Sequence, residues 1–119
     1  MKSAGIQELL GCSPRALVER WDAIYGPGWA NDGGLHIDHV RPCASFDFND
    51  PGQQQPCFHW ANLQLLPASE NLEKRDRWTA EDEIGWAWRM RSLGYEGELY
   101  LVFLGSKGEG SLFPGKASE

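Results

Sequence analysis

Two short apolar segments, each closed by a proline, place the strongest constraint on how this chain can fold. Residues 35–40 alternate as a half-buried strand does and stop before Pro42, and residues 61–66 form a second strand-like segment that stops at Pro67. The connection between them, residues 43–57, is rich in Asp, Asn, Gln, Gly and Pro, so it is expected to be long and irregular. Connections of that length are unusual unless they have a function.

Helices are expected on both sides of these strands. Apolar residues at helical spacing, with a proline in the first helical position, predict a helix over residues 14–25. Ser69 can cap a helix over residues 70–77. Thr79, with an acidic residue three positions later, predicts a further helix that ends near Gly94.

Further expectations concern the core and the C-terminal part of the chain. Trp21 and Ile24 lie on one stripe of their predicted helix and are expected in the core. Residues 98–104 have strand character, and they are expected to pack on the core together with the preceding helix. Residues 105–119 are rich in Gly, Ser and Lys and are expected to form a flexible tail.

Length and charge limit the classes of protein that the chain can represent. At 119 residues it is expected to be one domain, and no segment reaches the about 20 apolar residues of a membrane span. The N-terminus lacks the layout of a secretory signal, so a soluble cytoplasmic protein is expected. Because 11 basic residues face 17 acidic ones, for a net charge of −6, any DNA-binding surface must be local, and residues 73–77 are the densest basic cluster.

Asp38 and His39, followed by Asn62 and Asn71, offer the parts of a single-metal phosphodiesterase site. Such a site needs oxygen ligands for a hard cation, a base for the attacking water, and a group that holds the base in its working tautomer. Asp38 and Asn71 can supply the oxygens, and His39 can be the base, oriented by Asn62. Since successive strand residues point to opposite faces, the backbone is expected to twist or leave the strand at Asp38 and His39.

With these residues at this spacing, residues 34–78 resemble the HNH endonuclease family, in the variant in which the last His is replaced by Asn. They are most similar to small stand-alone HNH proteins of bacteriophages and prophages. The resemblance implies an α+β fold with a ββα-metal core over residues 34–78. A helical lead-in (residues 1–33), a C-terminal helix and strand (residues 79–104) and the tail (residues 105–119) would complete a single domain.

The resemblance also implies a role for each site residue. Asp38 and Asn71 would bind one divalent metal ion, and His39 would be the catalytic base. Asn62 would steady the base and its loop without touching the metal. Mg²⁺ suits one charged and one neutral oxygen ligand, and Mn²⁺ can replace it. His36 shares a strand face with Asp38 and is an additional candidate ligand.

Three basic residues are candidates for binding DNA phosphates. Lys74 lies one helical turn after Asn71, and Arg77 continues that face. Arg41 follows the first strand directly. His59 either approaches DNA or stabilises the loop, and the sequence leaves both roles open.

The three cysteines, Cys12, Cys43 and Cys57, form neither a disulfide framework nor the paired Cys-x-x-Cys motifs that hold zinc in many HNH proteins. No structural zinc is therefore expected. Two alternatives stay open for Cys43 and Cys57: buried free thiols, or a zinc site completed by His59.

The function expected from these residues is metal-dependent hydrolysis of DNA phosphodiester bonds, nicking one strand to leave 5′-phosphate and 3′-hydroxyl ends. The resemblance implies a phage or prophage protein in a bacterial host cell. The acidic charge adds the expectation of a protein partner that delivers the chain to DNA. The alternative is a partner-dependent or non-catalytic accessory protein on an HNH scaffold, with a role in phage DNA packaging or against the host.

Overall fold

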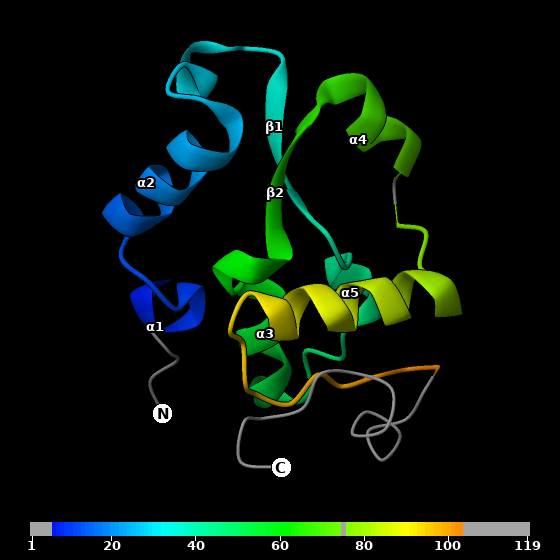
Figure 1. Ribbon diagram of the computed structural model, residues 1–119. Coiled ribbons are helices and arrows are strands. Elements are labelled where there is room, and N and C mark those ends of the chain that lie inside the picture. Colours follow the sequence, from blue (N-terminus) through cyan, green and yellow to red (C-terminus); the bar gives the residue numbers. More distant parts are fainter. Residues whose placement is uncertain (1–5, 75, 104–119) are drawn as a thin grey trace.

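The computed structural model describes residues 6–74 and 76–103, a mixed α+β arrangement around a small antiparallel sheet. Strand β1 (Leu35–His39) pairs with strand β2 (Leu63–Pro67), and Asp38 stands opposite Gln64 in the register. Helix α4 (Ala68–Lys74) follows β2 without a loop and packs on both strands. Figure 1 shows the two strands at the centre of the molecule, with α4 beside their upper end and helix α5 (Ala80–Ser92) below them.

The predicted helices are present, with small shifts of their ends. Helix α2 (Pro14–Tyr25) has its predicted bounds, and α4 begins two residues before the predicted start, at Ala68. Helix α5 (Ala80–Ser92) starts with the predicted capping box, in which the Thr79 side chain and the Asp82 carboxylate each accept a backbone hydrogen bond from the other residue. A short helix, α1 (Ile6–Leu10), precedes α2 and packs on helix α3 (Gln54–Phe58).

The connection between the strands is more ordered than expected. It contains the 3₁₀ helices η2 (Cys43–Ser45) and η3 (Pro51–Gln53) and the short helix α3 (Gln54–Phe58). A further 3₁₀ turn, η4 (Trp60–Asn62), delays the second strand until Leu63, two residues after its predicted start. The His59 ring caps this turn, because its Nδ1 accepts the Ala61 backbone N–H at 3.1 Å.

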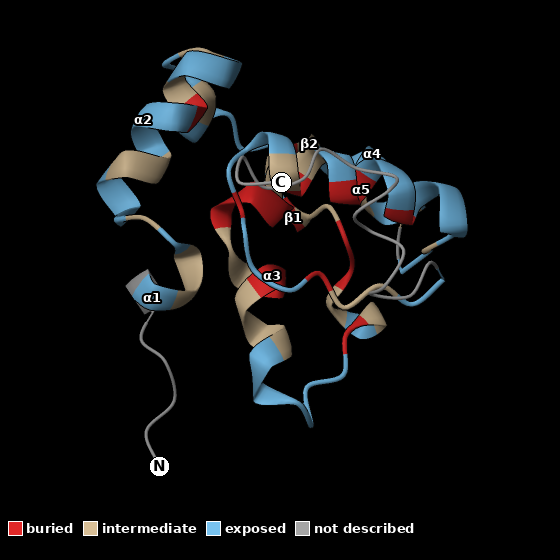
Figure 2. Cartoon of the chain, turned by 60° about the horizontal axis from the view of Figure 1, so that its bottom comes forward, coloured by how far each residue is buried: buried red, intermediate tan, exposed pale blue. Residues whose placement is uncertain are grey.

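The main core lies between η4, α3 and α5, where Figure 2 shows the buried residues gathered. The prediction for Ile24 is wrong, because its side chain is 63% exposed. Trp21 is buried as predicted, but it packs against the rings of Tyr25 and Trp29 rather than in the main cluster. That cluster consists of Phe46, Cys57, Trp60, Ala61, Trp86, Ala87, Met90, Tyr95 and Leu99.

The strand predicted over residues 98–104 is absent from its described part, residues 98–103. Instead, the two carboxylate oxygens of the fully buried Glu83 accept the backbone N–H groups of Val102 and Phe103, each at 2.8 Å. A side chain of α5 therefore satisfies backbone groups that a partner strand would otherwise satisfy. The tail predicted for residues 105–119 lies outside the described residues.

A membrane-crossing helix would need greater length and a more apolar face than any helix of residues 6–74 and 76–103 possesses.

Candidate active site

A cavity of about 270 Å³ lies at the C-terminal end of β1, and we refer to it as the β1-end cavity. It brings together Asp38, His39 and Asn71, three of the four residues that the sequence assigned to the chemistry, together with Lys74. The remaining lining residues are Pro42, Cys43, Ala44 and Asp76.

The end of the strand explains how two successive residues border one cavity. The backbone was predicted to twist or leave the strand at Asp38 and His39; these are the last two residues of β1, so it leaves the strand directly after them. Because the strand stops at His39, that side chain borders the cavity from the edge, while it also faces an apolar hollow shared with Ile37 and Phe58. Helix α4 packs on both strands and supplies Asn71 from the opposite side.

Asp38 is buried and held in place on one of its carboxylate oxygens. Its Oδ2 accepts a hydrogen bond from Gln64 Nε2 at 2.9 Å and lies 3.4 Å from Lys74 Nζ. Within the described ranges, all side-chain hydrogen bonds and ion pairs of Asp38 use Oδ2. Its Oδ1 is therefore available to a further ligand in the cavity.

The His39 ring is oriented by the connection between the strands. Its Nδ1 lies 3.0 Å from the carbonyl oxygen of Cys57, which can only accept, so the proton belongs on Nδ1 and the lone pair on Nε2. The Phe58 ring stands edge-on to the imidazole, with 5.6 Å between the ring centres. A hydrogen bond with the Cys43 side chain raises the pKa of His39, while burial opposes that rise.

Asn62 acts on this site through one carbonyl group. Its side chain is fully buried and does not line the cavity. Its Nδ2 donates to the Cys57 carbonyl oxygen at 2.8 Å, the same atom that accepts from His39. The other hydrogen bonds of this amide tie it to the Arg41 backbone and to Trp86 Nε1. Asn62 thus positions the carbonyl that orients His39, without contacting the ring.

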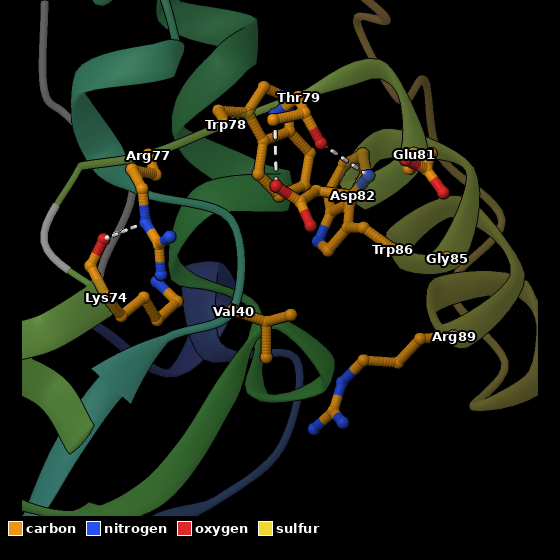
Figure 3. A pocket seen from close by; sticks show the side chains of 10 residues that line it. All are labelled: Val40, Lys74, Arg77, Trp78, Thr79, Glu81, Asp82, Gly85, Trp86 and Arg89. Atoms are coloured by element: carbon orange, nitrogen blue, oxygen red, sulfur yellow. Dashed lines mark hydrogen bonds between the residues drawn. The ribbon is translucent and has the colours of Figure 1, made fainter.

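Lys74 lines both the β1-end cavity and a second cavity of about 540 Å³, drawn in Figure 3, whereas Arg77 lines the second cavity alone. Lys74 Nζ donates to the His39 carbonyl oxygen at 2.9 Å, so this ammonium group is held at the edge of the site. The Arg77 guanidinium is anchored by Nε, which donates to the Lys74 carbonyl oxygen at 3.4 Å. Figure 3 shows the two side chains together on one side of the second cavity.

The prediction that Arg41 binds a DNA phosphate is wrong. Arg41 is fully buried, and its guanidinium donates to Ser45 Oγ, to the Ser45 carbonyl and to the Leu99 carbonyl. The central carbon of its guanidinium group, Cζ, lies 4.0 Å from the centre of the Phe46 ring. Burial lowers the pKa of Arg41 to about 10, against the opposing influence of Glu83. Arg41 therefore belongs to the core rather than to a DNA-binding surface.

The two other histidines occupy different surroundings. His36 is exposed in a neighbouring hollow that it shares with Asn71 and Asp76, so it borders the site without entering the β1-end cavity. His59 caps η4 and packs against Tyr95, at 4.9 Å between ring centres. Burial lowers the pKa of His59. Of the two roles left open for His59, the geometry favours stabilisation of the loop.

Sequence reasoning missed two residues at this site. Gln64 holds Asp38, and its place directly opposite in the strand register would have revealed it once the register was known. Asp76 lines the cavity from the segment after α4, in which only basic residues were predicted to have a function.

Two proteins of Acanthamoeba polyphaga mimivirus are similar to this chain. Uncharacterized protein L246 is 45% identical over 81 residues, which cover 64% of this chain and 35% of that protein. Uncharacterized protein L426 is 44% identical over 57 residues, 47% of this chain and 25% of that protein. The chain therefore spans about a third or less of these curated relatives. No family model and no solved structure matches the chain.

Proposed function

We propose that this chain is a metal-dependent endonuclease of the HNH type that hydrolyses DNA phosphodiester bonds. The observation that carries the proposal is the meeting of Asp38, His39 and Asn71 around one cavity. The order of β1, connection, β2 and α4 is the order expected of a ββα-metal core, and it supports the same proposal.

The residues around the cavity fit a hard divalent cation. The free Oδ1 of Asp38 and the amide oxygen of Asn71 are oxygen donors, and they leave most coordination positions to water and phosphate, as Mg²⁺ prefers. When bound there, Mg²⁺ or Mn²⁺ would supply Lewis-acid stabilisation of the charge that develops on the phosphate and on the leaving 3′ oxygen. Gln64 holds the Asp38 carboxylate in position for this role.

His39 would take the proton from the attacking water. Its Nε2 carries the lone pair, because Nδ1 is fixed by the Cys57 carbonyl oxygen. After proton transfer the ring is an imidazolium, and the same carbonyl accepts a stronger, charge-assisted hydrogen bond from Nδ1. One base beside one cavity cuts one strand, so the expected product is a nick with 5′-phosphate and 3′-hydroxyl ends.

Lys74 and Arg77 would contact the phosphates of the bound strand. Lys74 Nζ already faces a carboxylate oxygen of Asp38, and a phosphate oxygen entering the cavity would offer it a second anionic partner. Because the chain carries a net charge of −6, this local pair of cations gives weak binding to DNA, and a protein partner would deliver the chain to its substrate.

A supercoiled plasmid tests the proposal directly. The wild type should convert it to open circles in Mg²⁺ or Mn²⁺ but not in EDTA. His39→Ala should leave it supercoiled, and His59→Asn, which keeps an acceptor for the Ala61 N–H, should still nick. An unchanged rate in His39→Ala rejects His39 as the base.

A partner-dependent accessory protein is the alternative. Its support is the acidic charge together with apolar side chains that stand exposed around α5, such as Trp88 and Val102. If every lane of the plasmid assay stays supercoiled while the protein binds another protein tightly, the alternative replaces the nuclease.

A further inference from the structure

A second group of possible metal ligands lies on the inner side of His39. A ring nitrogen of His39 and the Sγ atoms of Cys43 and Cys57 all lie within 4.8 Å of one another, and we refer to these residues as the thiol–imidazole cluster. Its members come from the end of β1, from η2 and from α3, so the fold assembles a group that sequence spacing does not reveal.

The distances within the cluster are near those of a tetrahedral site. The two Sγ atoms are 2.9 Å apart, and Cys57 Sγ lies 3.9 Å from His39 Nδ1. Zinc binds thiolate sulfur at roughly 2.3 Å and imidazole nitrogen at roughly 2.0 Å, which sets ligand atoms somewhat under 4 Å apart. To form a coordination site, the two sulfur atoms would move apart by roughly 1 Å and the His39 ring would turn away from the Cys57 carbonyl oxygen.

The chemical state of the thiols also favours a metal. Cys57 is fully buried, whereas Cys43 is partly exposed at the cavity wall. The hydrogen bond from Cys57, followed by the effect of His39, lowers the pKa of Cys43 to about 5, while the same sulfur–sulfur contact and burial raise the pKa of Cys57. Metal binding would displace the protons of both thiols, because thiolate sulfur is the ligand.

We infer that His39, Cys43 and Cys57 bind a soft divalent cation such as Zn²⁺, with a fourth position open to water in the β1-end cavity. Two thiolates and an imidazole select zinc over the hard cation proposed for Asp38 and Asn71. The third ligand differs from the sequence alternative: the His59 ring is turned away to cap η4, and His39 occupies its place.

Zinc at this site would remove the base of the proposed nuclease, a consequence that rests on the proposed function. Coordination through Nδ1 needs the lone pair on that atom, so the ring proton moves to Nε2. The Cys57 carbonyl oxygen keeps its hydrogen bond from Asn62 but loses the one from His39. His39 then presents an N–H to the cavity and cannot accept the proton of water.

Cobalt binding by the reduced full-length chain tests the site without any nuclease readout. One equivalent of Co²⁺ should give the thiolate-to-cobalt charge-transfer absorption of a tetrahedral site, with release of thiol protons, and one equivalent of Zn²⁺ should abolish that absorption by displacing the cobalt without further proton release. Cys43→Ser and Cys57→Ser should lose the absorption, whereas Cys12→Ser and His36→Gln should keep it. Cys43 is the more exposed of the two cysteines, so Cys43→Ser answers the question even where Cys57→Ser fails to fold.

Absence of the charge-transfer absorption in the folded, reduced wild type overturns the inference, as does its full retention in Cys43→Ser. A mass loss of two hydrogens under reducing conditions, which marks a Cys43–Cys57 disulfide, also overturns it. In plasmid nicking with excess Mg²⁺, stoichiometric Zn²⁺ should slow the wild type at least tenfold, while the rate of Cys43→Ser should be the same with and without Zn²⁺. If the wild type does not nick at all, the proposed function fails while the cobalt result still decides the site.

Discussion

Two neighbouring groups of polar side chains, one in the core and one around the β1-end cavity, are built in opposite ways. In the buried polar network of Arg41, Asn62 and Glu83, each residue is fully buried and held by several internal hydrogen bonds. Around the β1-end cavity, Asp38 keeps one carboxylate oxygen for a further ligand and His39 keeps a lone pair on Nε2.

The difference separates stability from chemistry. A buried charge with all its hydrogen bonds satisfied holds elements together and cannot receive a substrate. A polar atom that is positioned by the fold but keeps a free acceptor can receive a metal ion or a proton. Asn62 belongs to the first group and acts on the second through the Cys57 carbonyl oxygen.

The largest effect is expected for Asp38→Asn. The variant keeps the size of the side chain but removes the charge that a divalent cation requires, so nicking should fall roughly 100-fold or more. The free energy of unfolding should change little in comparison, because the second carboxylate oxygen has no partner among the described residues. Plasmid nicking and urea unfolding measured on the same preparation give both quantities. A rate within a factor of three of the wild type would remove Asp38 from the metal site.

Arg41→Met and Arg77→Met should behave in opposite ways. Arg41→Met leaves the carbonyl oxygens of Ser45 and Leu99 without their guanidinium donor and should lower the free energy of unfolding by about 1–3 kcal/mol. Arg77→Met changes an exposed side chain and should alter the free energy of unfolding by less than about 0.5 kcal/mol. The same variant should bind DNA more weakly. Chemical denaturation and a salt-dependent DNA-binding titration measure the two effects. Equal stability of the two variants would contradict the division between core and surface.

Asn62→Ala should affect both groups. It leaves the Arg41 N–H and the Trp86 indole N–H without their acceptor, which should lower the free energy of unfolding by about 1–3 kcal/mol. It also removes one of the two donors to the Cys57 carbonyl oxygen, so nicking should fall by more than the unfolded fraction explains. Nicking rates corrected for the folded fraction, measured by circular dichroism, separate the two contributions. A corrected rate equal to that of the wild type would limit Asn62 to a structural role.

The smallest effect is a pH dependence carried by His59. Because burial lowers the pKa of His59 in the folded chain, the unfolded chain binds more protons as the pH falls below the ordinary value of 6.5. The stability that His59 contributes is therefore present above pH 6.5 and is lost as the pH falls through its lowered value. His59→Asn should flatten the slope of unfolding free energy against pH in this range, and His36→Gln, at an exposed position of β1, should keep it. An unchanged slope in His59→Asn would assign the pH dependence to other groups.

Local signals in the sequence predicted most of the regular structure. The bounds of α2, the capping box of α5 and the first strand follow from residues close together in the chain. The prediction of a strand over residues 98–104 is wrong, because the apolar residues of this segment reflect burial in the core rather than pairing with another strand. Leu99 is indeed fully buried, but the backbone of this segment is satisfied by Glu83 from α5.

In the candidate site, too, local sequence signals identified some residues but not those whose contacts come from distant parts of the chain. Asp38, His39 and Asn71 could be identified from residue type and spacing, and they do border one cavity. Arg41 could not be placed, since its neighbours Leu99 and Glu83 come from distant parts of the chain. The thiol–imidazole cluster was only half predicted, because the choice between His39 and His59 depends on how the connection between the strands folds.

The hydrogen bonds from the backbone of Val102 and Phe103 to Glu83 determine which amino acids these two positions can accept. At residues 102 and 103 the carboxylate accepts main-chain N–H groups, and the side chains of Val102 and Phe103 point outward, being 59% and 53% exposed. Almost any pair of amino acids would be accepted at these two positions, so the segment can drift in sequence or carry a new recognition sequence without loosening its attachment. Proline is the exception, because it has no N–H to offer.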